Sequence, residues 1–356
     1  MSKLIVTIAR LGSGGAERVL SILSGPLANH FDEVIYVIWD GGTIYYTLDN
    51  RIRLLSLPDC SHCKGRMQQI PTFRRIVKQE TPDLILSFLT PINMLVLTST
   101  LCMKIPVIVA ERNDPMFVSG GKPAMLVRDM LYKRAKGILA QTEYAKSCYH
   151  GSLNKKTTVI YNPVIMSNDL VGSALLSEKE KMIVSVGSLG PKKDQATLIR
   201  AFHQFYQKHK DYKLVIYGEG KLRGTLEQFI VSLGLKDIVL LPGSSKQVWE
   251  AMKKAEIFTL SSTHEGMSNA MIEAMCLGLP VVTTRVAGST DLINSGENGF
   301  IVDVKDVNAL AEKMILLVDN PGLRMTVGRE AIKVYDKLHV DKISKQWVEY
   351  LSGELE

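Results

Sequence analysis

The sequence predicts an α/β protein made of two doubly wound domains with parallel sheets. Short apolar runs rich in β-branched residues alternate with longer segments of helical periodicity along the whole chain, which is typical of sheets built from βαβ units. The alternation begins again after a polar stretch at residues 167–180. The length of 356 residues is also too great for one ordinary core and fits two domains of roughly 150–180 residues.

Six segments of the first half are short and apolar, so we expect them to be strands. They are residues 4–9, 33–38, 84–88, 107–110, 137–140 and 158–160. Helical spacing of apolar residues predicts helices between these strands. The helices are expected at residues 16–29, 92–102 and 126–136.

The second half repeats the pattern with six further strands. They are expected at residues 182–186, 213–217, 238–240, 257–260, 281–283 and 299–302. The helices between them are expected at residues 196–208, 222–233, 247–254 and 270–277. The sequence contains neither a solenoid-type repeat nor a low-complexity segment, so both halves are expected to be globular domains.

The composition excludes several classes of protein. A charged content of 22% and only 13 prolines argue against a disordered or collagen-like chain. No apolar run approaches the ~20 residues that span a bilayer, and the apolar start of the chain is too short for a signal peptide. The five cysteines are scattered and imply no disulfide framework: Cys60, Cys63, Cys102, Cys148 and Cys276. We therefore expect a cytoplasmic protein.

The excess positive charge lies entirely in the first half. Residues 1–170 carry 20 Lys and Arg against 13 Asp and Glu, whereas residues 171–356 carry 23 of each. Basic residues concentrate in two segments, which contain Lys64, Arg66, Arg74, Arg75 and Lys78, and then Lys122, Arg128, Lys133, Arg134 and Lys136. Apolar residues lie among the first set at near-helical spacing: Met67, Ile70, Phe73, Ile76 and Val77.

Two interpretations of this basic amphipathic stretch stay open. It could lie on an anionic membrane surface, or it could be the solvated face of an ordinary helix. A nucleic-acid-binding role is less favoured, because the interleaved aromatic residues and the motifs of such proteins are absent.

A glycine-rich turn is expected directly after the first strand. Residues 11–18 read Leu-Gly-Ser-Gly-Gly-Ala-Glu-Arg and open a helix. Gly14 and Gly15 would let the backbone approach a ligand, and the helix N-terminus offers amides to an anion. A dinucleotide-binding fingerprint would have a third glycine where this chain has Glu17, which weakens a dehydrogenase interpretation. A tight turn without a ligand is the alternative.

A second motif combines two carboxylates with a helix start. The strand at residues 257–260 is followed by Glu265 before a helix and Glu273 inside it, and the helix ends at Gly278-Leu-Pro280. Ionised carboxylates accept hydrogen bonds from vicinal hydroxyls of a sugar or ribose. The amides of residues 267–270 would meet a group lying over the helix start. This pattern is what a nucleotide-sugar requires.

A third motif places a lysine after a glycine turn. Gly187 and Ser188 follow the strand at residues 182–186, and Lys193 precedes the next helix. A lysine held there could neutralise a departing diphosphate. Taken alone, such a turn is more often simply solvated.

These motifs together resemble the retaining glycosyltransferases of family four, which have the two-domain GT-B fold. The resemblance extends over nearly the whole chain. It rests on Gly14-Gly15-Ala-Glu-Arg18, Val186-Gly187-Ser-Leu with Lys193, Tyr217-Gly218-Glu-Gly220, Glu265 with Glu273, residues 287–293 and residues 298–302. It implies two Rossmann-like domains facing across a cleft, an N-terminal acceptor domain at residues 1–165 and a nucleotide-sugar domain at 166–335. Residues 336–356 would form a C-terminal helix that packs back on the first domain.

The resemblance also implies roles for individual residues. Glu265 would contact hydroxyls of the donor sugar, and Glu273 the ribose of the nucleotide. Lys193 would be the cation for the diphosphate. The sugar-diphosphate would be lined by Gly187, Ser188, Met267, Ser268, Asn269 and Ala270.

Other positions would line the rest of the cleft. Gly218 and Gly220 would lie near the base, and Gly14, Gly15 and Arg18 would close the cleft from the acceptor side. Glu111, Arg112 and Asn113 occupy the neighbourhood where many relatives place a histidine near the acceptor. Which of the three would contact substrate stays open.

One position departs from the family pattern. Relatives usually have an arginine where this chain has Ser188, so half of the usual cationic pair is missing, and Lys192 or Arg285 could replace it. His264 beside Glu265 is expected to support the site rather than to react. No metal and no cofactor are expected, because the family needs none and Cys60-Ser-His-Cys63 has no second pair of ligands.

The function implied by the resemblance is transfer of a hexose or N-acetylhexosamine, with retention, from a UDP-sugar. The basic first half favours a lipid-linked saccharide acceptor at the inner face of the cytoplasmic membrane, with the enzyme bound peripherally. Assembly of lipopolysaccharide, O-antigen or capsule would use such an enzyme. The alternatives are a GDP-mannose-dependent transferase, a nucleotide-sugar 2-epimerase of the same architecture, and a non-catalytic nucleotide-binding scaffold.

Overall fold

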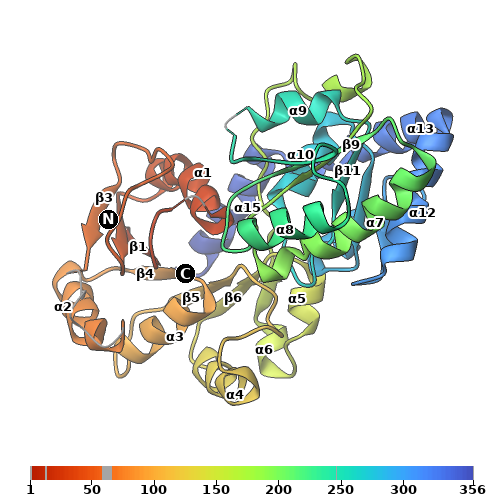
Figure 1. The fold of residues 1–356 in the computed structure, drawn as a ribbon. Coiled ribbons are helices and arrows are strands. Elements are labelled where there is room, and N and C mark those ends of the chain that lie inside the picture. The colour runs from red at the N-terminus through yellow and green to blue at the C-terminus, as the bar shows by residue number, and fades with distance from the viewer. Residues whose placement is uncertain (1, 13, 58–65, 246, 356) are drawn as a thin grey trace. The chain divides into compact units, whose positions relative to one another are not determined.

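The computed structural model describes residues 2–12, 14–57, 66–245 and 247–355, which fold into two units. Unit 1 combines Met1–Pro163 with Val340–Glu356, and unit 2 is the continuous segment Val164–His339. From the sequence, these two changes of unit were expected after residues 165 and 335. Each unit contains one sheet of parallel strands (Figure 1), and the predicted α/β class is confirmed.

The sheet of unit 1 has the strand order β3-β2-β1-β4-β5-β6-β7. Its strands are β1 Lys3–Ile8, β2 Glu33–Ile38, β3 Arg53–Ser56, β4 Leu84–Phe88, β5 Val107–Glu111, β6 Gly137–Ala140 and β7 Thr157–Val159. The central β1 pairs with β2 from Lys3–Glu33 to Ile8–Ile38, and with β4 on its other side. The inner strands are continuous apolar runs because helices cover both faces of the sheet.

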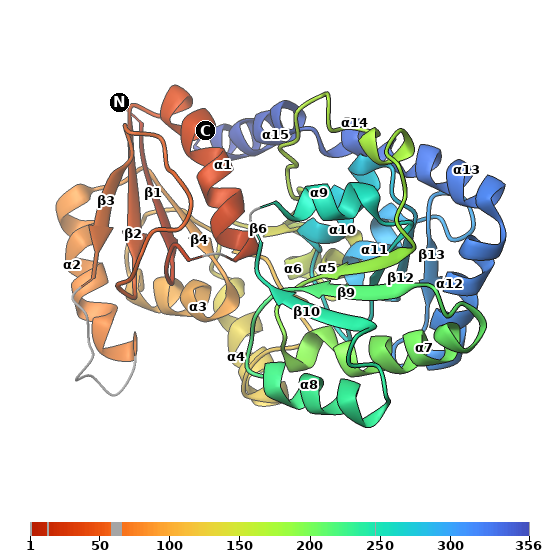
Figure 2. The ribbon, with the colours of Figure 1, turned by 45° about the horizontal axis from the view of Figure 1, so that its top comes forward.

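Seven α-helices of unit 1 lie in the described residues. They are α1 Gly15–His30, α2 Ile70–Glu80, α3 Thr90–Ser99, α4 Gly121–Tyr132, α5 Glu143–Ser147, α6 Ser152–Lys155 and α15 Val340–Gly353. Helix α15 packs beside α1 (Figure 2). Its Trp347 is fully buried and stacks on Phe88 at 5.7 Å between ring centroids. Helix α15 therefore completes the core of unit 1, although it follows unit 2 in the sequence.

The basic amphipathic stretch around α2 packs its apolar side inward. Phe73 and Val77 are fully buried in the core of unit 1, and Ile70 and Ile76 pack against that core. Arg74 donates to the backbone oxygens of Ser99 and Leu101 at 2.7 and 2.8 Å, at the end of α3. These four apolar side chains of α2 are therefore used in the core of unit 1, which favours the interpretation as a solvated helix face. Lys64, Cys60 and Cys63 lie outside the described residues.

The sheet of unit 2 has the order β10-β9-β8-β11-β12-β13. Its strands are β8 Met182–Val186, β9 Lys213–Tyr217, β10 Val239–Gly243, β11 Ile257–Leu260, β12 Val281–Thr284 and β13 Phe300–Val302. The chain starts at β8, runs outward to β10, and returns to pair β11 with β8 on the opposite side. Ligands of doubly wound sheets bind at the carboxyl ends of the strands where the order reverses in this way. In unit 2 that point lies between β8 and β11.

The helices of unit 2 cover both faces of its sheet. They are α7 Gln195–Lys208, α8 Arg223–Ser232, α9 Val248–Lys254, α10 Asn269–Leu277, α11 Ala287–Leu292, α12 Val307–Asp319, α13 Pro321–Ala331 and α14 Val334–Leu338. Helix α10 is buried from Met271 to Leu277 and ends at Gly278, whose φ of 82° favours glycine. This burial fixes the position of the α10 backbone. Across the described residues of both units, no helix combines the length and apolarity needed to cross a membrane.

Candidate functional site

The loops that follow β8 and β11 are fastened to each other through backbone oxygens. The Ser261 hydroxyl donates to the backbone oxygens of Lys193 and Asp194 at 2.9 and 2.8 Å, and the Thr263 amide donates to the oxygen of Lys192 at 2.8 Å. The Thr284 hydroxyl at the end of β12 donates to the oxygen of Ser262 at 2.6 Å. Both loops leave the carboxyl ends of the strands where the sheet order reverses. Their side chains are thereby brought together.

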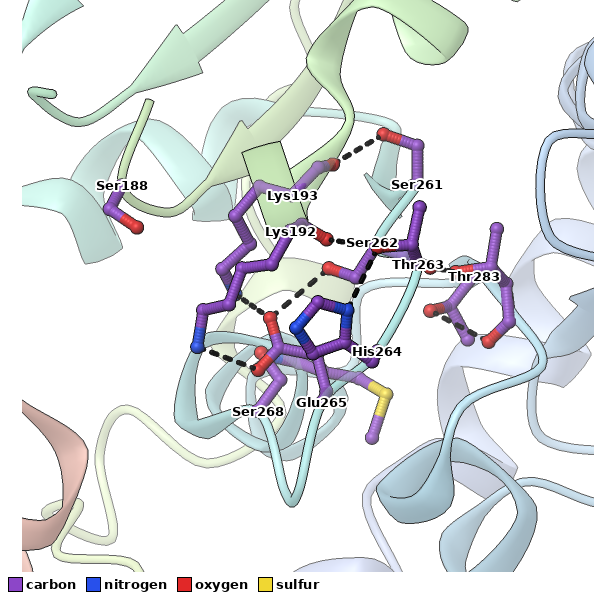
Figure 3. Close-up of polar contacts among 12 residues, drawn as sticks. Ser188, Lys192, Lys193, Ser261, Ser262, Thr263, His264, Glu265, Ser268 and Thr283 are labelled. Atoms are coloured by element: carbon purple, nitrogen blue, oxygen red, sulfur yellow. Dashed lines mark hydrogen bonds and ion pairs between the residues drawn. The ribbon is translucent and has the colours of Figure 1, made fainter. Parts of the chain in front are cut away.

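Glu265 lies at the centre of this cluster (Figure 3). Its carboxylate forms an ion pair with Lys193, lies 3.7 Å from Nζ of Lys192, and accepts a hydrogen bond from the Ser262 hydroxyl at 3.1 Å. The side chains of Glu265 and Lys193 are 8% and 12% exposed, whereas that of Lys192 is 44% exposed. Two cations thus share one buried carboxylate, and Lys192 has the more open position.

The electrostatics of the cluster keep Glu265 ionised. Burial alone would raise the pKa of Glu265, but attraction to Lys193 and Lys192 and hydrogen bonds from Lys193 and Ser262 lower it more, so its pKa lies below the usual 4.5. An ionised carboxylate accepts hydrogen bonds and donates none. Two lysines against one carboxylate also leave a net positive charge, which favours an anionic ligand nearby.

Gly187 makes room for the lysine of this cluster. A Cβ at position 187 would lie 3.0 Å from Cε and 3.4 Å from Nζ of Lys193. Gly218 and Gly220 have a different reason for being glycine. A Cβ on Gly218 would lie 2.0 Å from the oxygen of Gly187, and one on Gly220 2.2 Å from the oxygen of Leu189. The turns after β8 and β9 can pack this closely only without those side chains.

The N-terminus of α10 lies directly after Glu265. Ser268 caps the helix by accepting a hydrogen bond from the Met271 amide at 3.4 Å, and the first amides of a helix favour an anion at this end. Gly288 fixes the turn, since a Cβ there would lie 2.8 Å from the oxygen of Gly266 and from Cα of Met267. Met267, Ser268, Asn269 and Ala270 are therefore held at one short helix start.

Glu273 lies in the second turn of α10 and is 6% exposed. Its Oε2 accepts a hydrogen bond from the indole N–H of Trp249 on α9 at 2.9 Å. Neither Trp249 nor Ser262 was among the site residues expected from the sequence. No local pattern marks Trp249, which lies on a different helix from its partner.

Ser188, where the resemblance to the family implies an arginine, is exposed in this structure. Ser188 lies apart from the lysine–glutamate cluster (Figure 3), and its backbone oxygen accepts from Gln195 at 2.9 Å. Of the two candidate replacements, Lys192 lies in the cluster, whereas Arg285 pairs with Asp303 at 3.0 Å. The ring nitrogen Nδ1 of His264 lies 3.0 Å from the Thr263 hydroxyl, on the loop that carries Glu265.

In unit 1, the glycine-rich turn follows β1 at the carboxyl edge of the sheet. Gly14 precedes α1, and its oxygen accepts from the Arg18 amide at 3.1 Å. Glu17 bends back over the turn, since a Cβ on Gly14 would fall 2.3 Å from its Oε2. Gly15 is exposed, so the helix start has one open side.

Two of the three residues expected near an acceptor are buried. Glu111 is fully buried and accepts hydrogen bonds from Thr90, Tyr132 and Tyr149 at 2.7, 3.0 and 3.4 Å. Burial raises its pKa despite these hydrogen bonds. Its side chain contacts other parts of unit 1.

Arg112 is buried as well. It donates to Asn162 at 2.7 Å and lies 5.7 and 5.4 Å from the ring centroids of Phe88 and Trp347. Burial lowers the pKa of Arg112 to about 9. Asn113 is exposed, and it is the one of the three whose side chain reaches solvent.

In the part of the chain that the structure describes, no three His, Cys, Asp or Glu side chains come together as a group of metal ligands. The cationic groups of the candidate site are lysines.

The sequence has clear relatives among known proteins. Residues 168–334 match the family model described as glycosyl transferases group 1. An alpha-1,4-N-acetyl-D-galactosaminyltransferase of Campylobacter jejuni, named for a diNAcBac-PP-undecaprenol acceptor, is 26% identical, with 99% of each chain covered. A diacetylbacillosaminyl-diphospho-undecaprenol 4-alpha-N-acetylgalactosaminyltransferase of the same organism is 29% identical and covers 99% of this chain and 100% of its own.

Solved structures share the fold over nearly the whole chain. The Anabaena protein HepE, in complex with UDP and glucose, superposes with a TM-score of 0.81 at 19% identity, covering 99% of this chain and 100% of its own. Sucrose-phosphate synthase from Thermosynechococcus elongatus gives a TM-score of 0.84 at 16% identity, with 98% of each chain covered.

Proposed function

Because this chain is a glycosyltransferase with the GT-B fold, we propose that it transfers a sugar from a UDP-sugar to a lipid-linked saccharide. The transferred sugar is an N-acetylhexosamine or a hexose, and its anomeric configuration is retained. The observation that carries the proposal is the pairing of Glu265 with Lys193 and Lys192 at the start of α10. The site joins an acceptor for sugar hydroxyls to two cations and the positive end of a helix.

Each part of the cluster has a task in this proposal. Lys193 and Lys192 neutralise the charge that grows on the leaving diphosphate, which stabilises the transition state more than the ground state. Lys192 takes the place of the arginine that relatives have at Ser188. Glu265 accepts hydrogen bonds from the donor sugar, and Glu273 accepts them from the ribose. Met267 to Ala270 direct their amides at the diphosphate.

Retention is proposed to proceed by attack on the same face as the departing group, with the leaving phosphate taking the acceptor proton. No side chain then serves as a covalent nucleophile. Glu265 then only accepts hydrogen bonds from the donor sugar. It suits that task because a carboxylate that is ion-paired with lysine and hydrogen-bonded to Ser262 is stabilised as an anion. Neither a metal ion nor a cofactor is required in this scheme, since the lysines supply the positive charge.

The acceptor is proposed from the two Campylobacter relatives, whose names specify undecaprenol-linked saccharides. Unit 1 would bind the acceptor, with Asn113 and the Gly14–Gly15 turn at the carboxyl edge of its sheet. The product would enter a cell-surface polysaccharide, such as lipopolysaccharide O-antigen or capsule. The enzyme would work at the inner face of the cytoplasmic membrane.

Peripheral membrane binding is proposed to use α4 and the loop before it. The exposed apolar side chains of this region, with their basic neighbours, form what we term the α4 surface: Met116, Phe117, Leu126, Val127, Met130, Lys122, Lys133 and Arg134. Leu126 and Met130 lie one turn apart and are 72% and 62% exposed, and the basic residues lie at the two ends of this stripe. Apolar side chains between lysines suit the boundary of an anionic bilayer. Asp129 accepts a hydrogen bond from Arg128 at 2.8 Å. Its negative charge is therefore offset by Arg128 and reduces the positive charge of the α4 surface little.

A screen of UDP- and GDP-sugars against lipid-linked saccharides, followed by mass spectrometry, tests the proposal. A glycosylated lipid formed only with a UDP-sugar is the expected result. Transfer from GDP-mannose would show that the donor is this nucleotide-sugar and not a UDP-sugar. Conversion of a UDP-sugar without any acceptor would indicate the 2-epimerase. Nucleotide binding with no turnover of any donor would leave the scaffold role.

A further inference from the structure

Trp249 and Glu273 join two helices of unit 2 through one hydrogen bond. Trp249 is in the first turn of α9, and its indole N–H lies 2.9 Å from Oε2 of Glu273 in the second turn of α10. The indole nitrogen can only donate, and an ionised carboxylate can only accept. The direction of this hydrogen bond is therefore fixed, unlike one to a hydroxyl group.

We propose that Trp249 is a positioning residue that holds the Glu273 carboxylate in the orientation that receives the ribose hydroxyls of the donor nucleotide. This inference rests on the proposed function, in which Glu273 binds the ribose. It adds a residue from a helix outside the motif of Glu265 and Glu273.

The chemistry of the carboxylate leaves room for both partners. An ionised carboxylate offers about four lone-pair positions, so the Trp249 N–H and two ribose hydroxyls can be accommodated together. A glutamate side chain has three rotatable bonds, and ordering it costs conformational entropy. A hydrogen bond made before the nucleotide arrives removes part of this cost from the binding step.

The surroundings make the rest of this arrangement rigid. Helix α10 is buried from Met271 to Leu277, so the backbone that carries Glu273 has little freedom. Helix α9 packs against α10, and Met252 of α9 is fully buried. The side-chain torsions of Glu273 remain, and the hydrogen bond from Trp249 helps to restrain them.

The test compares binding of UDP and of 2′,3′-dideoxy-UDP by calorimetry to the full chain. Trp249→Phe keeps an aromatic ring but removes the N–H. We expect it to weaken UDP binding up to about tenfold, the usual cost of ordering one flexible side chain on binding. Binding of the dideoxy nucleotide should not change, because it has no ribose hydroxyls for Glu273 to receive. Glu250→Gln is the matched control on α9, since its exposed side chain pairs with Lys253 at 2.9 Å, and it should bind both nucleotides normally.

Other results would contradict either the role of Trp249 or the role of Glu273. Equal weakening of both nucleotides by Trp249→Phe would mean that Trp249 supports the fold or contacts the base. Unchanged UDP binding would mean that Glu273 holds its position without it. Glu273→Ala separates this inference from the proposed function. If that variant binds UDP normally, the ribose assignment fails, whereas a loss in Glu273→Ala without one in Trp249→Phe rejects only the positioning role.

Discussion

Gly187 lies against the aliphatic part of Lys193, so that a Cβ at position 187 would approach Cε of the lysine to 3.0 Å. This relationship links a turn after β8 to the cation that pairs with Glu265. A glycine at this position therefore affects charge placement as well as backbone conformation.

Gly187→Ala should displace Lys193 and lower turnover roughly tenfold, because small shifts of a charged group in a site are costly. The free energy of unfolding should change little, since the contact is with a flexible side chain. Steady-state kinetics and thermal unfolding measure the two effects. Gly190→Ala is the matched control, because a Cβ there meets no atom within 4 Å. Equal activity of the two variants would contradict the proposed link.

Lys193→Ala should depress kcat on the order of a hundredfold while donor affinity falls less, since leaving-group charge grows towards the transition state. Lys192→Ala should have a smaller effect in the same direction, because Lys192 is more exposed and lies 3.7 Å from Glu265. Lys181→Ala, which removes an exposed lysine paired with Asp211, serves as control. If Lys193→Ala keeps kcat within a few-fold of the parent enzyme, another group must neutralise the diphosphate.

The stability of unit 2 should depend on pH through Glu265. The pKa of Glu265 is lowered in the folded state, so its ionised form contributes stability above the ordinary pKa of 4.5, and this contribution is lost as the pH falls through the folded value. The Tm difference between the parent protein and Glu265→Gln should therefore be largest near neutral pH and shrink below about pH 4.5. A difference that stays constant down to pH 3 would show that the ion pairs do not stabilise the fold.

Membrane binding should depend on α4 and not on α2. Replacing Leu126 and Met130 with serine removes two exposed apolar side chains and should weaken flotation with anionic vesicles at least about tenfold. Leu176→Ser is the matched control, because Leu176 is 91% exposed in unit 2. Arg75→Ala with Lys78→Ala should float like the parent protein.

Salt provides a second measurement of the same surface. Binding should weaken as ionic strength rises, because Lys122 and Lys133 contribute through screened attraction. Undiminished flotation of the Leu126→Ser, Met130→Ser variant would reject the α4 surface and leave the glycosyl-transfer proposal untouched.

The sequence located the elements whose burial is unambiguous. Strand β8 was expected at the residues where it occurs, because inner parallel strands are apolar on both faces. Strand β3, Arg53–Ser56, was not expected, since this short edge strand is only half-buried and gives no such pattern. The two interpretations of the α2 stretch could not be separated from the sequence, because amphipathic spacing indicates an apolar side without indicating what covers it.

The site was predictable where its residues are neighbours in the sequence. Glu265 and Glu273 belong to one strand-turn-helix segment, and the structure places both there. The surroundings of Glu111 were not predictable, because Thr90, Tyr132 and Tyr149 come from three other segments. The sequence likewise could not show which of Lys192 and Arg285 lies near Glu265. In the fold Lys192 lies near Glu265, whereas Arg285 pairs with Asp303.

The return of α15 to unit 1 sets the order in which the two units are completed during synthesis. All of unit 2, Val164–His339, is synthesised before Trp347 is added. Until then, Phe88 and the Arg112 guanidinium lack the indole that covers them. The unit that begins the chain is thus the last to be finished, and a chain released near residue 340 would contain all of unit 2 but lack the helix that completes the core of unit 1. Chaperones that recognise apolar surface would be expected to engage the first unit at that stage.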